Sequence, residues 1–117
     1  MEDLISVLLH SVNQVHVFHL QTKSFAEHKA LNEYYDSIGD LADKLAEAYQ
    51  GKYGILNYKN VNKLEKYESK ENLIEYFDKI IKMIEKTRPI KDHFIDNIVQ
   101  EVETLIYQTL YKIKYLN

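Results

Sequence analysis

Apolar residues recur at steps of three and four over most of this chain, which is the spacing of one face of an α-helix. Near the N-terminus this stripe consists of Ile5, Leu8, Leu9, Val12 and Val15, together with His16 and His19. Comparable series predict helices over about residues 2–21, 25–50, 70–87 and 90–115. At 117 residues the chain has room for one hydrophobic core, and with three Gly and one Pro it has the composition of a helical protein. We therefore predict an all-α fold in a single domain, residues 1–117.

Local signals indicate where the helices begin and end. Ser24 followed by Glu27 is the capping-box pattern that starts a helix. Gly51 is expected to end the second helix in the left-handed conformation. Arg88-Pro89 is expected to separate the last two helices, because proline restricts the residue before it.

The connection between the second and third helices runs from about residue 51 to residue 69. A hairpin between neighbouring antiparallel helices usually takes about 2–8 residues. This connection is long enough to run the length of a bundle. We therefore expect a four-helix bundle with a long crossover between helices two and three, which then run parallel.

Charge and residue usage argue against several functional classes. The formal net charge of −3 disfavours nucleic-acid binding, which depends on many Lys and Arg contacts to phosphates. The absence of cysteine removes disulfides, thiolate metal sites and thiol catalysis. The apolar run 4–9 follows two acidic residues and is too short for a secretory signal or a membrane-spanning helix. We expect a cytoplasmic protein that does not bind membranes.

Three histidines are predicted to lie together at one end of the bundle. His16 and His19 are on the apolar stripe of the first helix, and His28 is early on the second. Residues equidistant from a tight turn in an antiparallel helix pair lie side by side, so His19 and His28 should face each other. A buried imidazole must be hydrogen-bonded or metal-bound. Both roles stay open here: the rings are satisfied by carbonyls or water, or they hold a metal.

An acidic face adjoins these histidines on the second helix and comprises Asn32, Asp36, Asp43 and Glu47. Asp43 and Glu47 are four residues apart, so their carboxylates point the same way and are able to chelate one ion, a solvated surface being the alternative. Asp43 lies about 22 Å from His28 along the helix axis. If the two residues share a metal, a second subunit must contribute one of them, which predicts a homodimer or higher homo-oligomer. Histidine and carboxylate ligands without sulfur favour iron, manganese or zinc.

The last helix carries a tyrosine at every fourth position, namely Tyr107, Tyr111 and Tyr115. This stripe indicates packing or a subunit interface, where tyrosine is enriched. Nothing in the chain resembles a phosphate-binding glycine loop or a Ser-His-Asp arrangement.

These features resemble the Dps-like branch of the ferritin superfamily. The resemblance rests on the histidine-rich end of the first helix, a short turn with Phe25, His28 early in the second helix, and Asp43-x-x-x-Glu47 near its end. It implies a ferritin-like four-helix bundle whose metal centre lies between two subunits. The implied activity is oxidation of Fe(II) by peroxide or oxygen. The alternative is a metal-free interaction or accessory protein with structural histidines.

The resemblance leaves the first histidine ligand open. His16 has the family's spacing of twelve residues before His28, whereas His19-Leu20-Gln21 resembles the family's His-Trp-Asn. The string SFAEHKAL…YYD…YQGKYG also resembles small phage-encoded ferritin-like proteins.

The acidic positions match the family in part. Asp43 and Glu47 occupy the positions of the acids that the partner subunit contributes, but Asn32 stands where the family carries an acid. Asp36, one turn further on, is expected to substitute in part. The fourth helix lacks Glu-x-x-His, so the resemblance implies an intersubunit site rather than an intrasubunit di-iron centre.

Overall fold

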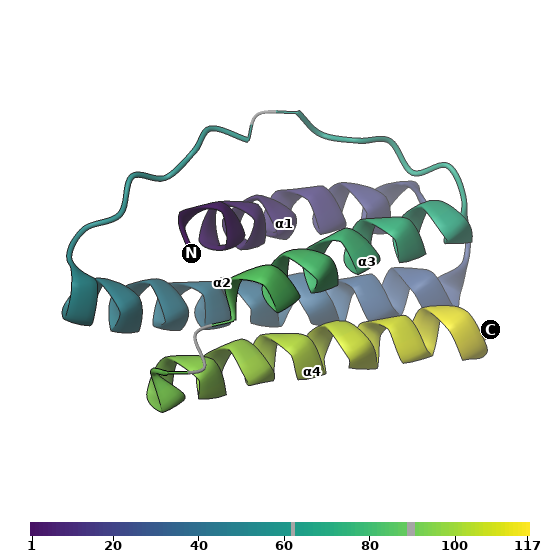
Figure 1. Ribbon diagram of the computed structural model, residues 1–117. Helices are drawn as coiled ribbons and strands as arrows, with labels where there is room; N and C mark the ends of the chain where they lie inside the picture. Colours follow the sequence, from purple (N-terminus) through teal and green to yellow (C-terminus); the bar gives the residue numbers. More distant parts are fainter. Residues whose placement is uncertain (62, 89–90) are drawn as a thin grey trace.

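The computed structural model describes residues 1–61, 63–88 and 91–117, and its regular structure is helical (Figure 1). The helices are α1 (Glu2–Gln21), α2 (Phe25–Tyr53), α3 (Lys70–Thr87) and α4 (His93–Tyr115). No strand occurs in the described ranges, so the prediction of an all-α chain with four helices is confirmed for them. None of these helices has the length and apolarity needed to span a membrane.

Two helix ends differ from the prediction. The sequence predicts that Gly51 ends the second helix, but α2 continues to Tyr53. The chain leaves the helix at Gly54, whose φ of 94° favours glycine and whose N–H donates to Gln50 O at 2.8 Å. Gly54 is therefore the terminating glycine. The predicted break at Pro89 and helix start at residue 90 lie outside the described residues, and α4 begins at His93.

Side chains close the turn between α1 and α2. Ser24 Oγ accepts a hydrogen bond from the Glu27 backbone N–H at 3.2 Å, which is half of the predicted capping box. The Glu27 carboxylate instead accepts hydrogen bonds from the hydroxyls of Thr22 and Tyr67, at 2.7 and 2.8 Å. Glu27 is buried, so its carboxylate joins this turn to the segment that precedes α3.

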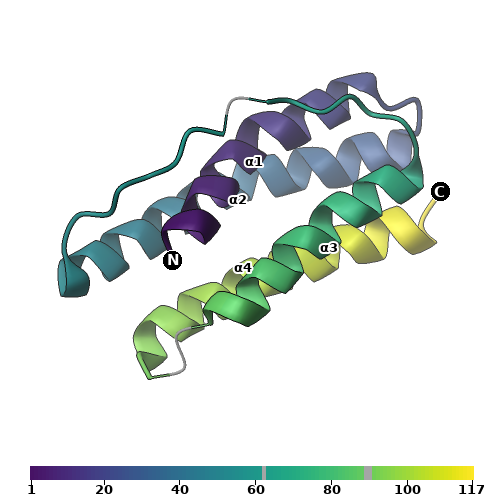
Figure 2. The ribbon, with the colours of Figure 1, turned by 45° about the horizontal axis from the view of Figure 1, so that its top comes forward.

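The helices form two antiparallel pairs, α1 with α2 and α3 with α4, and the pairs meet where α2 packs on α4 and α1 on α3. In the described ranges α1 does not contact α4, nor does α2 contact α3, so each of these pairs is diagonal. Residues 54–61 and 63–69, called the crossover here, return along the whole bundle (Figures 1 and 2). As a result, α2 and α3 run in the same direction.

The core contains the apolar stripe of every helix, but the predicted stripe of α1 is wrong in part. Leu9 and His16 are exposed. The buried stripe of α1 lies one residue earlier and comprises Leu4, Ile5, Leu8, Val15 and Phe18. From α2, Tyr34 is fully buried, whereas Tyr35 is half-buried. The difference arises because α1 packs against both α2 and α3, which turns its core face away from the outer side of the α1–α2 pair.

One hydrogen-bonded tyrosine lies inside this core. Tyr34 Oη is 2.9 Å from Ser11 Oγ, and the Ser11 hydroxyl donates to Leu8 O at 2.6 Å. Because the serine proton is used, Tyr34 is the donor of the first bond. Burial raises the pKa of Tyr34, so the phenol is a neutral donor at physiological pH.

The crossover is held on α1 by a row of hydrogen bonds, called the polar ladder here. Side chains of α1 supply one half of each bond, and these are Glu2, Ser6, His10, Gln14 and Gln21. Backbone groups of the crossover supply the other half, in the same order from Asn57, Lys59, Lys63, Glu65 and Tyr67. The first four side chains are spaced by four residues and therefore lie on one face of α1.

Gln14 forms the central contact of the polar ladder. Its Nε2 donates to Glu65 O at 2.9 Å, and its Oε1 accepts from the Glu65 N–H at 2.7 Å. Gln14 is fully buried. Its side-chain amide therefore satisfies both backbone groups of a residue that has no neighbouring strand to pair with.

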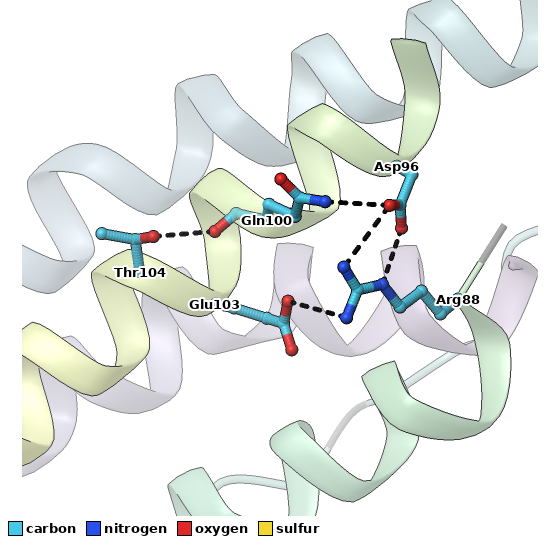
Figure 3. A network of polar contacts seen from close by, with 5 residues as sticks. All are labelled: Arg88, Asp96, Gln100, Glu103 and Thr104. Atoms are coloured by element: carbon cyan, nitrogen blue, oxygen red, sulfur yellow. Dashed lines mark hydrogen bonds and ion pairs between the residues drawn. The ribbon is translucent and has the colours of Figure 1, made fainter. Parts of the chain in front are cut away.

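Ion pairs join the end of α3 to α4. Arg88, at the end of α3, donates to Asp96 in α4 with an Nε–Oδ1 distance of 2.8 Å, and it also faces Glu103 at 3.8 Å (Figure 3). Gln100 Nε2 donates to the same aspartate at 2.9 Å. The bond from Arg88 holds the pKa of Asp96 below its ordinary value. At neutral pH this carboxylate is therefore ionised and binds α3 to α4.

A second carboxylate joins α2 to the start of α4. Lys52 and Tyr53, in the last turn of α2, both donate to Asp92. These bonds lower the pKa of Asp92. The end of α2 is therefore fixed against the residue that precedes α4.

Replacing Gln14 by Ala should lower the free energy of unfolding by about 2 kcal/mol, because both backbone groups of Glu65 lose their partner. Urea unfolding followed by circular dichroism measures the change. Hydrogen exchange at the Glu65 amide should accelerate in the same variant. Gln108→Ala, at an exposed position of α4, is the control and should leave stability nearly unchanged. A Gln14→Ala protein as stable as the control would show that the ladder does not hold the crossover.

Candidate functional site

His19 and His28 meet across the turn between α1 and α2, as the sequence predicts. His19 Nδ1 lies 2.7 Å from His28 O, and His28 Nδ1 lies 2.9 Å from His19 O. A carbonyl oxygen only accepts, so both Nδ1 atoms carry a proton and donate. The two rings stack with centroids 3.6 Å apart and planes at 21°. We call this reciprocal pair the histidine clasp.

His16 and Tyr35 extend the clasp into a cluster of four rings. The exposed His16 ring stacks on Tyr35 with a centroid distance of 4.3 Å, and its centroid is 5.8 Å from that of His19. Tyr35 meets the His19 ring edge-on at 5.3 Å. All three predicted histidines are therefore close together. Tyr35 comes seven residues after His28 and so lies on the same helix face, but its place in this cluster was not predicted from the sequence.

A chain of hydrogen bonds leads from the cluster to the first acidic residue. The Tyr35 hydroxyl donates to Asn32 Oδ1 at 2.6 Å, and Asn32 Nδ2 donates to Asp36 Oδ2 at 3.1 Å. Asn32 thus acts as a link between a phenol and a carboxylate. Of the predicted metal ligands, His16, His19, His28, Asn32 and Asp36 are connected by these contacts.

Asp43 and Glu47 stand apart from that group. Both are exposed on α2, and Asp43 is about 22 Å from His28 along the helix at a rise of about 1.5 Å per residue. Within one chain they are too far from the histidine clasp to share an ion with it. Only a second copy is able to bring these carboxylates next to the rings.

The histidine clasp itself does not converge on one ion. An imidazole nitrogen binds a metal at about 2.0–2.1 Å along a lone pair in the ring plane. The two ring planes are stacked and nearly parallel, so lone pairs that lie in these planes do not converge on one ion between the rings. In the described ranges, no three His, Cys, Asp or Glu side chains are arranged around one position that suits a metal. The imidazoles have the right chemistry for iron, manganese or zinc, but the clasp geometry of one chain does not fit such an ion.

Fold and site together define a helical protein with a histidine-closed hairpin and a long crossover. The chain belongs to a family of unknown function, DUF5856, which matches residues 19–113. The matched range contains every predicted site residue except His16.

A phage protein is similar to this chain over nearly its whole length. It is described as an uncharacterized 14.6 kDa protein in the mobD-ri intergenic region of Enterobacteria phage T4. The two are 24% identical over 110 residues, which covers 94% of this chain and 84% of that protein. No solved structure matches this chain significantly. A phage relative agrees with the resemblance to small phage proteins, while neither description names a metal, a substrate or a partner.

Replacing His19 by Ala should lower the free energy of unfolding by about 1–2 kcal/mol, since the ring stack and a hydrogen bond to a backbone carbonyl are both lost. His19→Asn should recover about half of that loss, because its amide nitrogen is able to donate in place of Nδ1. Urea unfolding of metal-free protein measures both. His93→Ala, an exposed histidine at the start of α4, is the control. Equal stability of His19→Ala and His93→Ala would refute a structural role for the clasp.

Proposed function

We propose that this protein is a ferritin-like four-helix bundle that serves a phage as a non-catalytic interaction protein. The path of the chain supports the fold assignment. Two antiparallel helix pairs are joined by one long crossover, and the helices on either side of it are diagonal neighbours. Ferritin-like bundles have one such crossover.

The composition of the interior is the observation that carries the non-catalytic role. Ferritin-like metal enzymes place a Glu from each of two helices and a Glu-x-x-His from each of the other two in the bundle core. Here the buried polar side chains of the described core, other than acids, are hydroxyls, Gln14 and His19. The buried acids Glu27, Asp92 and Asp96 lie at helix ends, and each accepts hydrogen bonds from neighbouring side chains. The carboxylates that are buried therefore join segments of the chain.

The tyrosine face of α4, made of Tyr107, Tyr111 and Tyr115, is the interaction surface that we propose. These side chains are 54%, 56% and 72% exposed. Their spacing of four puts them on one side of α4, and Tyr111 and Tyr115 contact each other with centroids 6.0 Å apart. Tyrosine is enriched at protein interfaces because it offers a large rigid surface with a polar tip. A second copy of the chain is the proposed occupant.

A second candidate function is binding of divalent iron, manganese or zinc between two copies. One observation favours it: His19 and His28 donate from Nδ1 to backbone carbonyls, which is how metal-binding histidines are commonly held. This leaves their Nε2 atoms as acceptors. Under this proposal Asp43 and Glu47 of a second copy complete the site beside His16, and one histidine ring turns out of the clasp. A bound Fe(II) ion would then be the substrate, oxidised to Fe(III) with peroxide or oxygen as the electron acceptor.

The first proposal predicts that the protein self-associates through α4. Sedimentation velocity at about 0.1 mM should show a dimer or larger species. The double variant Tyr107→Ser/Tyr111→Ser should sediment as a monomer, because both replacements remove interface area while keeping the helix soluble. Ile55→Ser, at an exposed apolar position of the crossover, is the control and should associate like the parent protein. A parent protein that is monomeric, or association that survives in the double variant, would exclude the tyrosine face as the interface.

Metal titration separates the two candidate functions. If the histidines are structural, calorimetry with Fe(II) under anaerobic conditions, Mn(II) or Zn(II) should show no binding tighter than about 1 mM. A chelator should also leave the melting temperature unchanged. Micromolar binding that disappears in His28→Ala and persists in His93→Ala would overturn the structural assignment and establish the second candidate.

A further inference from the structure

A cleft of about 320 Å³ lies between α1 and α3 beneath the crossover. Its apolar walls come from Val7 of α1, Val61 of the crossover, and Ile80 and Met83 of α3. Lys63 and Lys79 also line it. The cleft shares no residue with the histidine clasp, and its volume falls at the lower end of the range for small-molecule sites.

The polar ladder explains why the cleft is there. His10 and Gln14 bind the backbone of Lys63 and Glu65, which fixes the crossover to α1 at this level. In the described ranges, the hydrogen bonds of residues 61 and 63–65 are made to α1 and not to α3. Of the neighbouring helix pairs, α1 and α3 also pack together least extensively. The crossover therefore covers the cleft while it is hydrogen-bonded to α1 at this level, and an apolar gap remains between α1 and α3.

The charged side chains around the cleft indicate which class of ligand it suits. Lys63 and Lys79 are both exposed, and neither forms an ion pair with any described residue. Glu65 contributes the single carboxylate among the lining residues, and the backbone of that residue belongs to the ladder. Positive charge therefore exceeds negative charge around an apolar interior. Such a combination suits a molecule with an apolar body and one anionic group.

We propose that this cleft binds a small aliphatic carboxylate. The alkyl chain lies against Val7, Ile80 and Met83, and the carboxylate faces Lys79 and Lys63 at the surface. This ligand site is independent of metal binding and of self-association through α4.

Titration of sodium octanoate into the ¹⁵N-labelled full chain tests the proposal. Amide shifts should saturate and be largest in residues 7–14, 61–65 and 76–83. Lys79→Gln should weaken binding about two- to fivefold, the effect of removing one partly exposed charge. Met83→Trp should abolish binding by filling the cleft. Lys82→Gln, three residues after Lys79 and also exposed on α3, is the matched control and should bind like the parent protein.

Neutral 1-octanol distinguishes charge recognition from adsorption of an alkyl chain. 1-Octanol should bind the parent protein more weakly than octanoate does. It should bind the parent and Lys79→Gln proteins with equal affinity. Octanoate shifts that do not saturate at about 10 mM, that are spread over the whole surface, or that are the same in Lys79→Gln and Met83→Trp would overturn the proposal. Lys79 is exposed, so its variant keeps the test valid if Met83→Trp does not fold.

Discussion

The contact between the Gln14 side chain and the Glu65 backbone is the one on which the position of the crossover most depends. An extended segment laid on a helix brings N–H and C=O groups that have neither a helical partner nor a strand beside them. The buried amide of Gln14 satisfies both groups of Glu65. Once this register is set, Ser6 and His10 meet the backbone of Lys59 and Lys63 along the same face of α1. The start of α3 is thereby placed at the end of the bundle opposite to the end of α2.

The histidine clasp provides hydrogen-bond partners for backbone groups at the α1–α2 turn, as the polar ladder does for the crossover. Each ring donates to the carbonyl of the other residue, so two backbone oxygens near the turn gain partners. These hydrogen bonds explain why histidines occupy the helix faces that meet at the turn, and the explanation requires no metal ion. The same bonds leave both Nε2 atoms as acceptors, which is the chemical reason that a metal remains a testable second function.

Sequence patterns predicted the local structure of this chain better than its long-range contacts. Helix periodicity and the serine cap at residue 24 give helix starts that coincide with those of α2 and α3, because these signals act within one turn. The meeting of His19 and His28 was also predictable, since a short turn fixes which residues face each other. The one-residue error in the core stripe of α1 has a tertiary cause, namely that this helix has two helical neighbours and a crossover. The polar ladder was missed because the spacing of Glu2, Ser6, His10 and Gln14 on a polar helix face looks the same whether water or a backbone segment covers it.

The polar groups of this chain are concentrated where its segments join. Glu27 links the first turn to Tyr67, Asp92 links α2 to α4, and Asp96 links α3 to α4. A carboxylate that already accepts hydrogen bonds from charged or hydroxyl donors is a poor candidate for chemistry on a substrate, since its lone pairs are in use. For Asp92 and Asp96 these bonds also lower the pKa. Function should therefore reside in groups that the fold leaves without a partner. In the described part of the chain such groups include the tyrosine face of α4, the Nε2 edges of the clasp and the two lysines of the cleft, together with the buried Tyr76 hydroxyl that lines the same cleft.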